Sequence, residues 1–362
     1  MSAHIRATST SEHGTGSVAP GRAFVPREPF RPARGLASPH VQTGFSYLAH
    51  SWRTPELVRE RWETPDDDFF DVDRVLAPPG APHLVVIHGL EGSSRSGYVL
   101  ATLRGAAVRG WGALALNFRS CSGEMNRQLR SYCSGETEDP AFAIRTLRAR
   151  GVTGPLYGVG FSLGGNVLLK LLAEQGDGSL LAAGVAVSAP FDLASCARAL
   201  DADGRWGAFY RAFYLRPLRR KALRKAVMFP GALDAGRIRR ARTFREFDDL
   251  ATAPMNGYRD AEDYWARCSS GPMLERIRRP ALVISAKDDP IARVDGVLDG
   301  LRNPHLTALV TERGGHVGFV SGSALRPRYW SEEVGFQYLE ERARQDGVAG
   351  APTPPASPRP AG

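Results

Sequence analysis

Short apolar runs alternate with amphipathic stretches along most of this chain. Six of the runs have the length of a strand, namely 83–88, 112–117, 156–161, 182–188, 281–285 and 306–310. Four stretches carry apolar residues at helical spacing, namely 98–109, 139–147, 166–175 and 327–344. Strands that alternate with helices are typical of a parallel sheet covered on both faces. The pattern therefore predicts an α/β fold with a mostly parallel central sheet flanked by helices.

Three segments interrupt this alternation. Residues 1–29 and 347–362 are polar or rich in Pro, Gly and Ala and have no hydrophobic period. They are predicted to be disordered tails on either side of one domain, residues 30–346. Between about 191 and 279 the chain carries aromatic and basic helical patterns and no convincing strand. We expect this segment to be a helical lid inserted above the sheet.

Composition and cysteine usage argue against several classes of protein. The 362 residues are 43% hydrophobic and 23% charged, as in ordinary soluble domains. The chain has no apolar run of the roughly 18 residues that a spanning helix needs, and no secretory signal is visible. The four cysteines form no C-x-x-C pair, which disfavours a disulfide scaffold and a zinc site. We expect structural thiols in a reducing, cytoplasmic setting and no metal or organic cofactor.

The positive charge is concentrated in one segment. The formal net charge is +9, and residues 205–245 alone hold 13 Lys and Arg against one acid, Asp234. Because aromatic residues alternate with these cations, the segment is interpreted as an amphipathic lid whose aromatics cover an acyl pocket. Peripheral contact with an anionic membrane is a second interpretation. Nucleic-acid binding would rest on charge without a recognised motif, and we expect no nucleic-acid partner.

One short motif has the pattern of a catalytic serine. Gly160-Phe161-Ser162-Leu163-Gly164 matches G-x-S-x-G, after a predicted strand and before a predicted helix. This is the setting of a nucleophile elbow, in which glycines let neighbouring backbone pass close to a sharp turn. The helix N-terminus behind the serine also favours negative charge. Ser162 is the predicted nucleophile, and a glycine-rich turn without chemistry is the alternative.

A serine nucleophile needs a base, and the base needs an acceptor that orients it. His316 lies in a glycine-flanked loop after the last predicted strand, at the same sheet edge as Ser162. Asp288 and Asp289 follow another predicted strand. We favour Asp289, because the turn into Pro290 directs its side chain inward, and expect Asp288 to cap the loop. The order Ser162, Asp289, His316 is that of α/β-hydrolases.

Backbone donors for an oxyanion are predicted at two positions. Residues 88–93, HGLEGS, follow the first predicted strand. A His-Gly at a strand end lets the N–H of Leu90 point at the elbow, where the N–H of Leu163 would be the second donor. His88 is expected to stabilise the loop and not to act as the base.

The sequence resembles the YheT-type branch of the α/β-hydrolase superfamily, a set of esterases related to the abhydrolase-domain lipases. The resemblance runs from about residue 30 to residue 321. Two positions differ from the family, which usually has Gly where this chain has Ser120 and His where it has Cys133. The motifs that carry the resemblance are FRP (30–32), PHVQT (39–43), HGLEGS (88–93), NFRSCSGE (117–124), SGETED (134–139), GFSLGGN (160–166), SAPF (188–191), REFDD (245–249), AKDDP (286–290) and GGHVGF (314–319).

The resemblance implies a serine carboxylesterase or lipase-like hydrolase that cleaves short- to medium-chain acyl esters through an acyl-enzyme. The expected substrate is a small-molecule ester or an acylglycerol. An alcohol acyltransferase that uses the same Ser162, His316 and Asp289 is the alternative. The polar loop 117–138 either hydrogen-bonds the substrate or is a salt-bridged loop that clamps the lid.

Overall fold

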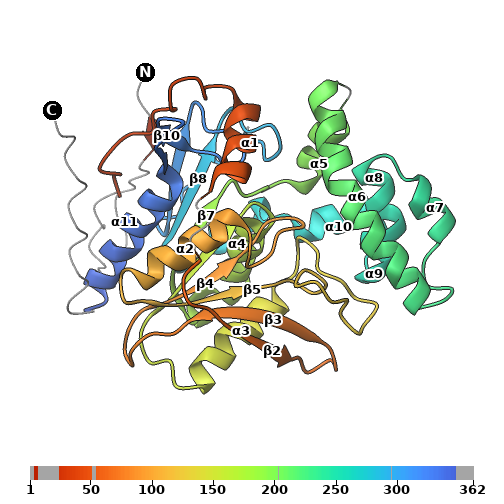
Figure 1. Ribbon diagram of the computed structural model, residues 1–362, viewed down its shortest axis with the longest axis horizontal. Helices are drawn as coiled ribbons and strands as arrows, with labels where there is room; N and C mark the ends of the chain where they lie inside the picture. The colour runs from red at the N-terminus through yellow and green to blue at the C-terminus, as the bar shows by residue number, and fades with distance from the viewer. Residues whose placement is uncertain (1–3, 7–23, 51–53, 203, 295, 348–362) are drawn as a thin grey trace.

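The computed structural model describes residues 4–6, 24–50, 54–202, 204–294 and 296–347. Its central sheet consists of β1 (His4–Arg6), β2 (Val58–Glu63), β3 (Phe69–Val75), β4 (His83–Ile87), β5 (Gly112–Leu116), β6 (Leu156–Phe161), β7 (Leu181–Val187), β8 (Ala281–Ala286) and β9 (Leu306–Thr311). The strand order is β1-β9-β8-β7-β6-β4-β5-β3-β2 (Figure 1). The strands β9, β8, β7, β6, β4 and β5 are parallel to their neighbours in this order. At the two edges of the sheet, β1 pairs antiparallel with β9, and β3 pairs antiparallel with both β5 and β2. The predicted mostly parallel sheet is confirmed.

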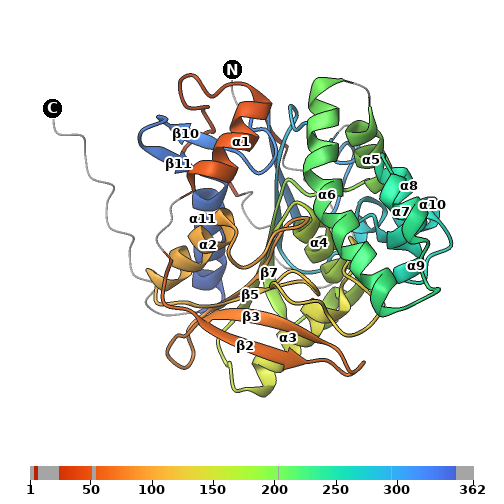
Figure 2. The same ribbon diagram turned by 45° about the vertical axis from the view of Figure 1, so that its right-hand side comes forward.

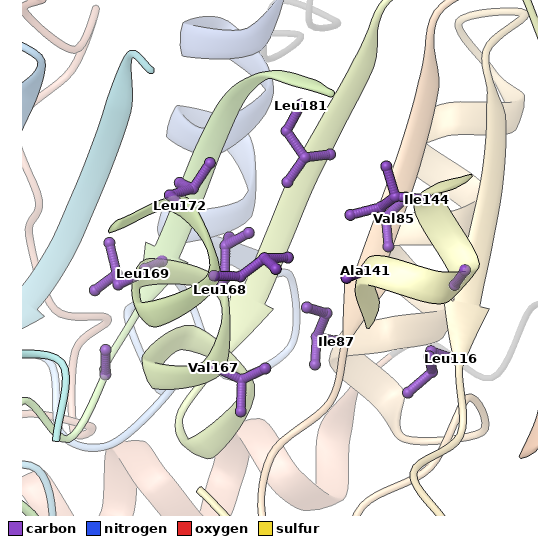
Figure 3. Packing of buried hydrophobic residues seen from close by; sticks show 14 of the residues in the cluster. Val85, Ile87, Leu116, Ala141, Ile144, Val167, Leu168, Leu169, Leu172 and Leu181 are labelled. Atoms are coloured by element: carbon purple, nitrogen blue, oxygen red, sulfur yellow. The ribbon is translucent and has the colours of Figure 1, made fainter. Parts of the chain in front are cut away.

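Helices cover both faces of this sheet. The helices α2 (Gly97–Ala107) and α11 (Trp330–Gln345) lie on one face, and α3 (Glu138–Ala149) and α4 (Leu163–Gln175) lie on the other (Figures 1 and 2). Successive residues of β4 point to opposite faces, so Val86 packs with the first pair of helices and Val85 with the second. Figure 3 shows Leu168 and Leu172 of α4 turned toward the sheet. Burial of each such leucine stabilises the fold by about 1.5–3 kcal/mol.

The chain between β7 and β8 is helical, as predicted. Within residues 191–279 the described part holds no strand. This helical insertion has its own apolar core, which includes Leu200, Tyr210, Ile238 and Phe247, and it lies to one side of the sheet (Figure 2). Its elements are α5 (Leu193–Asp201), α6 (Arg205–Met228), α7 (Ala235–Arg240), α8 (Phe244–Phe247), η2 (Asp248–Thr252), α9 (Ala253–Met255), α10 (Ala261–Cys268) and η3 (Gly271–Arg276).

The prediction of a disordered N-terminal tail is wrong where the structure describes it. Residues 4–6 form β1, which pairs antiparallel with β9. Phe24 is buried and meets Tyr338 of α11 edge to face, with ring centroids 5.2 Å apart. Backbone pairing and this aromatic contact therefore hold parts of the segment on the domain. Residues 1–3, 7–23 and 348–362 of the predicted tails lie outside the described residues.

Several elements have no counterpart among the predicted ones. They are the β2–β3 hairpin, the helix α1 (Pro39–Ala49) and the short strands β10 (Val320–Gly322) and β11 (Pro327–Tyr329). The strand β11 also takes the first residues of the predicted helix at 327–344, so that α11 begins only at Trp330.

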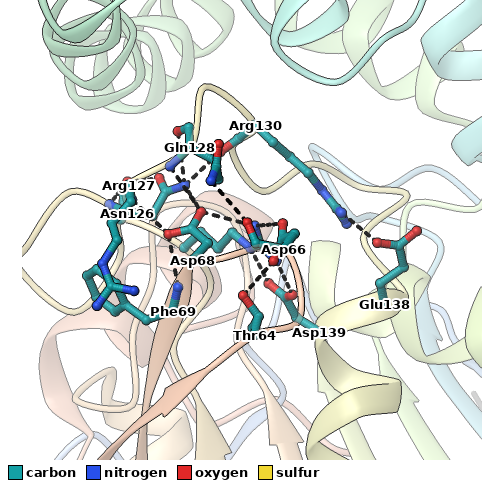
Figure 4. Close-up of polar contacts among 12 residues, drawn as sticks. Thr64, Asp66, Asp68, Phe69, Asn126, Arg127, Gln128, Arg130, Glu138 and Asp139 are labelled. Carbon is teal, nitrogen blue, oxygen red and sulfur yellow. Dashed lines mark hydrogen bonds and ion pairs between the residues drawn. The ribbon is translucent and has the colours of Figure 1, made fainter.

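A buried ion-pair network fixes the polar loop 117–138 (Figure 4). The Arg119 side chain is 2% exposed, and its guanidinium lies 2.6 Å from Asp66, 3.0 Å from Asp68 and 2.7 Å from Asp139. The ammonium of Lys225, on α6, donates to the carbonyl oxygen of Asn126 at 2.9 Å. These contacts support the interpretation of a salt-bridged loop that also holds the helical insertion.

Ser120 has a backbone conformation that residues with a side chain rarely adopt. Its φ is +65°, in the left-handed region that favours glycine. The Ser120 hydroxyl donates to Asn126 Oδ1 at 2.7 Å and accepts from the Asn126 N–H at 3.1 Å. These hydrogen bonds offset the conformational cost of a side chain at this turn.

Candidate active site

The turn between β6 and α4 carries Ser162 at its tip. Ser162 has φ +52° and ψ −122°, a strained conformation for a residue with a side chain. A Cβ atom on Gly160 would lie 2.3 Å from the carbonyl oxygen of Gly164, and one on Gly164 would lie 2.2 Å from that of Ile87. Both glycines of the motif are therefore required sterically, because backbone passes where a side chain would stand.

His316 joins Ser162 to Asp289 in one hydrogen-bonded chain. His316 Nε2 lies 2.8 Å from Ser162 Oγ, and His316 Nδ1 lies 2.9 Å from Asp289 Oδ2. A carboxylate can only accept, so Nδ1 carries the proton and Nε2 is free to accept from the serine hydroxyl. Both His316 and Asp289 are buried. The structure thus brings together the three side chains that the sequence placed far apart.

The two neighbouring aspartates have different partners. Asp289 Oδ1 accepts from the N–H groups of Ile291 and Ala292, each at 2.8 Å, so its carboxylate is fixed while it faces the imidazole. Asp288 Oδ1 instead accepts from the Gly315 N–H at 2.9 Å, in the loop that carries His316. Asp289 is therefore the aspartate that contacts the imidazole, and Asp288 stabilises the loop.

The helix α1 holds the His316 loop in place, a role that sequence reasoning missed. The Thr43 hydroxyl accepts from the His316 N–H at 2.9 Å. The Gln42 side chain brackets Val320, accepting from its N–H at 2.7 Å and donating to its carbonyl at 3.1 Å. A Cβ atom on Gly315 would lie 2.4 Å from the carbonyl oxygen of Pro39. The PHVQT motif at 39–43 was the available signal.

The two backbone N–H groups predicted as oxyanion donors belong to residues that line a pocket together with Ser162. The N–H groups of Gly89 and Glu91 are held by the Tyr98 and Tyr132 hydroxyls, each at 2.9 Å. The N–H between them, that of Leu90, has no acceptor among the described residues. The Leu163 N–H is at the first position of α4, where no intrahelical acceptor exists. Leu90 and Leu163 line the same pocket as Ser162.

His88 stabilises the loop and does not approach the serine as a base. Its Nδ1 lies 2.7 Å from the Gly89 carbonyl oxygen, and its Nε2 accepts from the Phe118 N–H at 3.1 Å. Desolvation by complete burial lowers the pKa of His88 to about 4, so the ring is neutral at pH 7. Both nitrogens are occupied by backbone groups, which ties the end of β4 to the end of β5.

Asn166 is a further structural residue that the sequence analysis did not single out. Its amide nitrogen donates to the carbonyl oxygens of Ser134 and Cys268, each at 2.8 Å, and its oxygen accepts from the Ser270 N–H at 2.9 Å. One fully buried side chain on α4 therefore joins the polar loop to the end of the helical insertion.

Two hollows meet at Ser162. A pocket of about 110 Å³ lies under the helical insertion and is lined mainly by apolar side chains, among them Leu200, Phe247 and Trp265. A second cavity of about 470 Å³ is lined by both Ser162 and His316. The α6 residues on this second cavity are Phe213, Tyr214, Pro217, Arg220, Lys221 and Arg224. Of the aromatic residues of α6, Phe213 and Tyr214 thus line this second cavity and not the apolar pocket, and Trp206, Phe209 and Phe213 are exposed.

The described residues contain neither a metal-binding cluster nor a spanning helix. In the parts of the chain with coordinates that can be described, no three His, Cys, Asp or Glu side chains are grouped so that they could hold a metal ion. Within the same ranges no helix combines the length and the apolar character needed to cross a bilayer. All four cysteines are free thiols, and three of them are buried.

Comparison with known proteins identifies the family. The family described as alpha/beta hydrolase fold matches residues 82–323. This chain belongs to the α/β-hydrolase family. The hydrolase is 41% identical over 310 residues to the protein named "Putative esterase YheT" of Escherichia coli (strain K12), which covers 84% of the hydrolase and 90% of that protein. The resemblance to the YheT-type branch is thereby confirmed.

Other relatives of the hydrolase carry lipase names. The monoacylglycerol lipase of Saccharomyces cerevisiae is 31% identical over 284 residues, which cover 76% of the hydrolase and 62% of the yeast protein. Phospholipase ABHD3 of Homo sapiens is 27% identical over 279 residues, which cover 75% of the hydrolase and 68% of the human protein. These names support an esterase- or lipase-like hydrolase activity.

Solved structures agree on the fold. Esterase Pf2001 of Pyrococcus furiosus aligns with a TM-score of 0.50 at 16% identity, covering 84% of the hydrolase and 94% of the esterase. A puromycin hydrolase aligns with a TM-score of 0.52 at 16% identity, covering 82% of the hydrolase and 40% of that protein. At such low identity these alignments bear on the architecture alone.

Proposed function

We propose that this hydrolase is a serine carboxylester hydrolase in which Ser162 is the nucleophile, His316 the general base and acid, and Asp289 the residue that orients the imidazole. The observation that carries the proposal is the chain of hydrogen bonds from Ser162 Oγ through His316 to Asp289. A serine becomes reactive when such a base accepts its proton. The strained turn at Ser162 adds support, because strain of this kind is concentrated at functional sites.

The proposed mechanism is acyl transfer through a covalent intermediate. Ser162 Oγ attacks the ester carbonyl while His316 Nε2 takes its proton. The N–H groups of Leu90 and Leu163 then donate to the negative oxygen of the tetrahedral intermediate, where loss of one donor costs about 2.7–4 kcal/mol of barrier. His316 returns the proton to the departing alcohol, and water hydrolyses the acyl-enzyme by the same steps in reverse.

The two hollows divide the substrate between them in this proposal. The apolar pocket beside Leu90 and Leu163 takes the acyl chain, and the larger cavity takes the alcohol portion. This apolar pocket, at about 110 Å³, is much smaller than the cavity of about 470 Å³, which favours short acyl chains. The substrate is thus a small-molecule ester or acylglycerol at the short end of the short- to medium-chain range.

A hydrolysis screen tests the proposed function. The substrates are p-nitrophenyl esters and monoacylglycerols from acetyl to dodecanoyl, and the control is Ser162→Ala. We expect turnover that is highest for short chains and is lost in the variant. Turnover that survives in Ser162→Ala would refute the assignment of the nucleophile. An arm with ethanol detects ethyl ester products, which would favour the acyltransferase alternative over hydrolysis.

We further propose that α1 and α6 contact the surface of an anionic lipid bilayer. Tyr47 and Leu48 of α1 are 65% and 70% exposed, and Phe209 of α6 is 54% exposed. Tyr47 and Phe213 pack edge to face and both line the cavity of Ser162, so this apolar rim surrounds the route to the site. The remainder of α6 is rich in arginine, which complements anionic head groups.

A further inference from the structure

The cavity that leads to Ser162 carries unbalanced positive charge. Three cations line it, Arg220, Lys221 and Arg224, against a single carboxylate, Glu91. Glu91 is already engaged, because its Oε1 accepts from the Lys221 ammonium at 2.8 Å and from the Tyr132 hydroxyl at 2.6 Å. Lys221 and Glu91 therefore neutralise each other, and the charges of Arg220 and Arg224 remain.

Neither of these arginines has a partner within the part of the chain that the structure describes. The side chains of Arg220 and Arg224 are exposed and form no ion pair, hydrogen bond or ring contact with those residues, whereas some other arginines are held by carboxylates. Arg59 is held by Asp73 at 2.6 Å, and Arg119 is held by Asp139 at 2.7 Å. Two exposed guanidinium groups without a partner in the fold, on the cavity that Ser162 also lines, are available to a ligand that supplies the negative charge.

The two arginines are placed to act on one ligand. They are four residues apart on α6, so they lie on the same helix face about 6 Å apart along the axis. Pro217 precedes them on that face and also lines the cavity. Each guanidinium is a planar fork that matches two oxygens of a phosphate or carboxylate. A single anionic group in the cavity can therefore be bound by both side chains.

An outer groove next to the cavity of Ser162 is also lined by positively charged side chains. It has a volume of about 830 Å³ and shares Met125, Arg220 and Arg224 with the cavity of Ser162. Arg216, Arg219 and Arg239 also line it, and its lining contains no acidic residue. A basic path of this kind raises the local concentration of anions near the cavity mouth.

We propose that Arg220 and Arg224 form an anion-binding subsite for a phosphate or carboxylate carried by the alcohol portion of the ester. This inference rests on the proposed esterase function, because that function defines which cavity receives the alcohol. The neighbouring apolar pocket holds the acyl chain, so the charged end of the substrate lies along α6 toward the solvent. Arg220 and Arg224 determine specificity here and take no part in the bond-breaking steps.

The test compares two esters that differ only in the charged group. The rates of hydrolysis of monobutanoylglycerol and butanoylglycerol phosphate are to be measured for three proteins. These are the wild type, Arg220→Gln/Arg224→Gln and Arg237→Gln/Arg240→Gln. The last variant removes the same charge from α7, at residues that line neither the cavity of Ser162, nor the apolar pocket, nor the outer groove. We expect the wild type to prefer the phosphate ester in kcat/KM. That preference should fall by about 10- to 100-fold in the α6 variant, as for lost hydrogen bonds to a charged group, and persist in the α7 variant.

A binding measurement separates this subsite from the esterase function. Calorimetry with Ser162→Ala protein and butanoylglycerol phosphate should show binding that disappears when Arg220 and Arg224 are also replaced. A titration with inorganic phosphate distinguishes a substrate group from a free anion. If the protein binds inorganic phosphate but shows no preference for the phosphate ester in hydrolysis, the proposal is overturned. A wild type that prefers the neutral ester, or a preference that survives in the α6 variant, would also overturn it. If the wild type hydrolyses neither ester, the esterase function fails, and calorimetry still decides whether the subsite binds the anion.

Discussion

Replacing Asp289 by asparagine should change the tautomer of the His316 imidazole, so that the proton moves from Nδ1 to Nε2. Asp289 Oδ1 accepts from the N–H groups of Ile291 and Ala292 at 2.8 Å, so the amide oxygen of an asparagine must stay at that position. The amide nitrogen then stands where Oδ2 lies, 2.9 Å from His316 Nδ1, and donates to it. The retained oxygen also lies 3.1 Å from Nδ1 but already accepts from two N–H groups, so the donation from the amide favours the tautomer with its proton on Nε2, which faces Ser162 and can no longer accept from the hydroxyl.

The loss of kcat should be large, because a His316 that carries its proton on Nε2 cannot accept the proton of Ser162. A reversed tautomer with intact geometry lowers kcat by about 10⁴-fold in the trypsin-like case from which this magnitude is taken, or about 5.4 kcal/mol of barrier. Steady-state hydrolysis of p-nitrophenyl butanoate measures it. The matched control is Asp288→Asn, which keeps an oxygen for the Gly315 N–H and should lower kcat by less than about tenfold. A decrease in Asp289→Asn no larger than that in Asp288→Asn would refute the reasoning.

Three further predictions address the turn, the insertion and the surface. Gly164→Ala should destabilise the fold by more than about 2 kcal/mol in urea denaturation, because its Cβ would lie 2.2 Å from the Ile87 carbonyl oxygen; a neutral effect would contradict the tight turn. Burial raises the pKa of Asp248 from 3.8 to about 7, so the folded state keeps a proton that the unfolded chain loses in that range. The free energy of unfolding should therefore fall as the pH rises from 3.8 to about 7, and Asp248→Asn should flatten this slope, whereas an unchanged slope would exclude Asp248 as its source. Sedimentation should show stronger binding to phosphatidylglycerol vesicles than to phosphatidylcholine vesicles and about tenfold weaker binding by Leu48→Ser/Phe209→Ser, whereas partitioning that ignores lipid charge would contradict the membrane proposal.

The parallel core and the three side chains at Ser162 could be predicted because their signals are local. Each buried strand is an apolar run, and each proposed catalytic residue lies in the turn or loop that follows such a run. Parallel strands end at one edge of the sheet, so residues far apart in sequence converge without any knowledge of their contacts. The choice between Asp288 and Asp289 could be made in the same way, from the proline that follows.

The β2–β3 hairpin could not be predicted because its signal is masked by charge. The buried strand β3 carries Asp71 and Asp73, which would normally argue against burial. Arg61 and Arg59, on the neighbouring strand, lie 2.9 Å and 2.6 Å from these carboxylates and neutralise them. Cross-strand pairing of this kind becomes visible only once the strands are side by side.

The supporting residues of the site were missed for a related reason. Gln42 and Asn166 act by bracketing backbone groups of distant segments, and no spacing rule relates a side-chain amide to a carbonyl far along the chain. The Arg119 network likewise joins three segments through side chains that look like an ordinary polar loop. Such contacts depend on tertiary structure, which periodicity does not encode.

Labelling with a fluorophosphonate, mapped to a residue by mass spectrometry, tests the central claim most directly. The reagent forms a covalent bond only with a serine whose hydroxyl is activated, so its position reports the nucleophile itself. The account predicts one adduct, on Ser162, that is absent from Ser162→Ala and strongly slowed in Asp289→Asn. An adduct on another serine, or a wild-type protein that does not react, would contradict it.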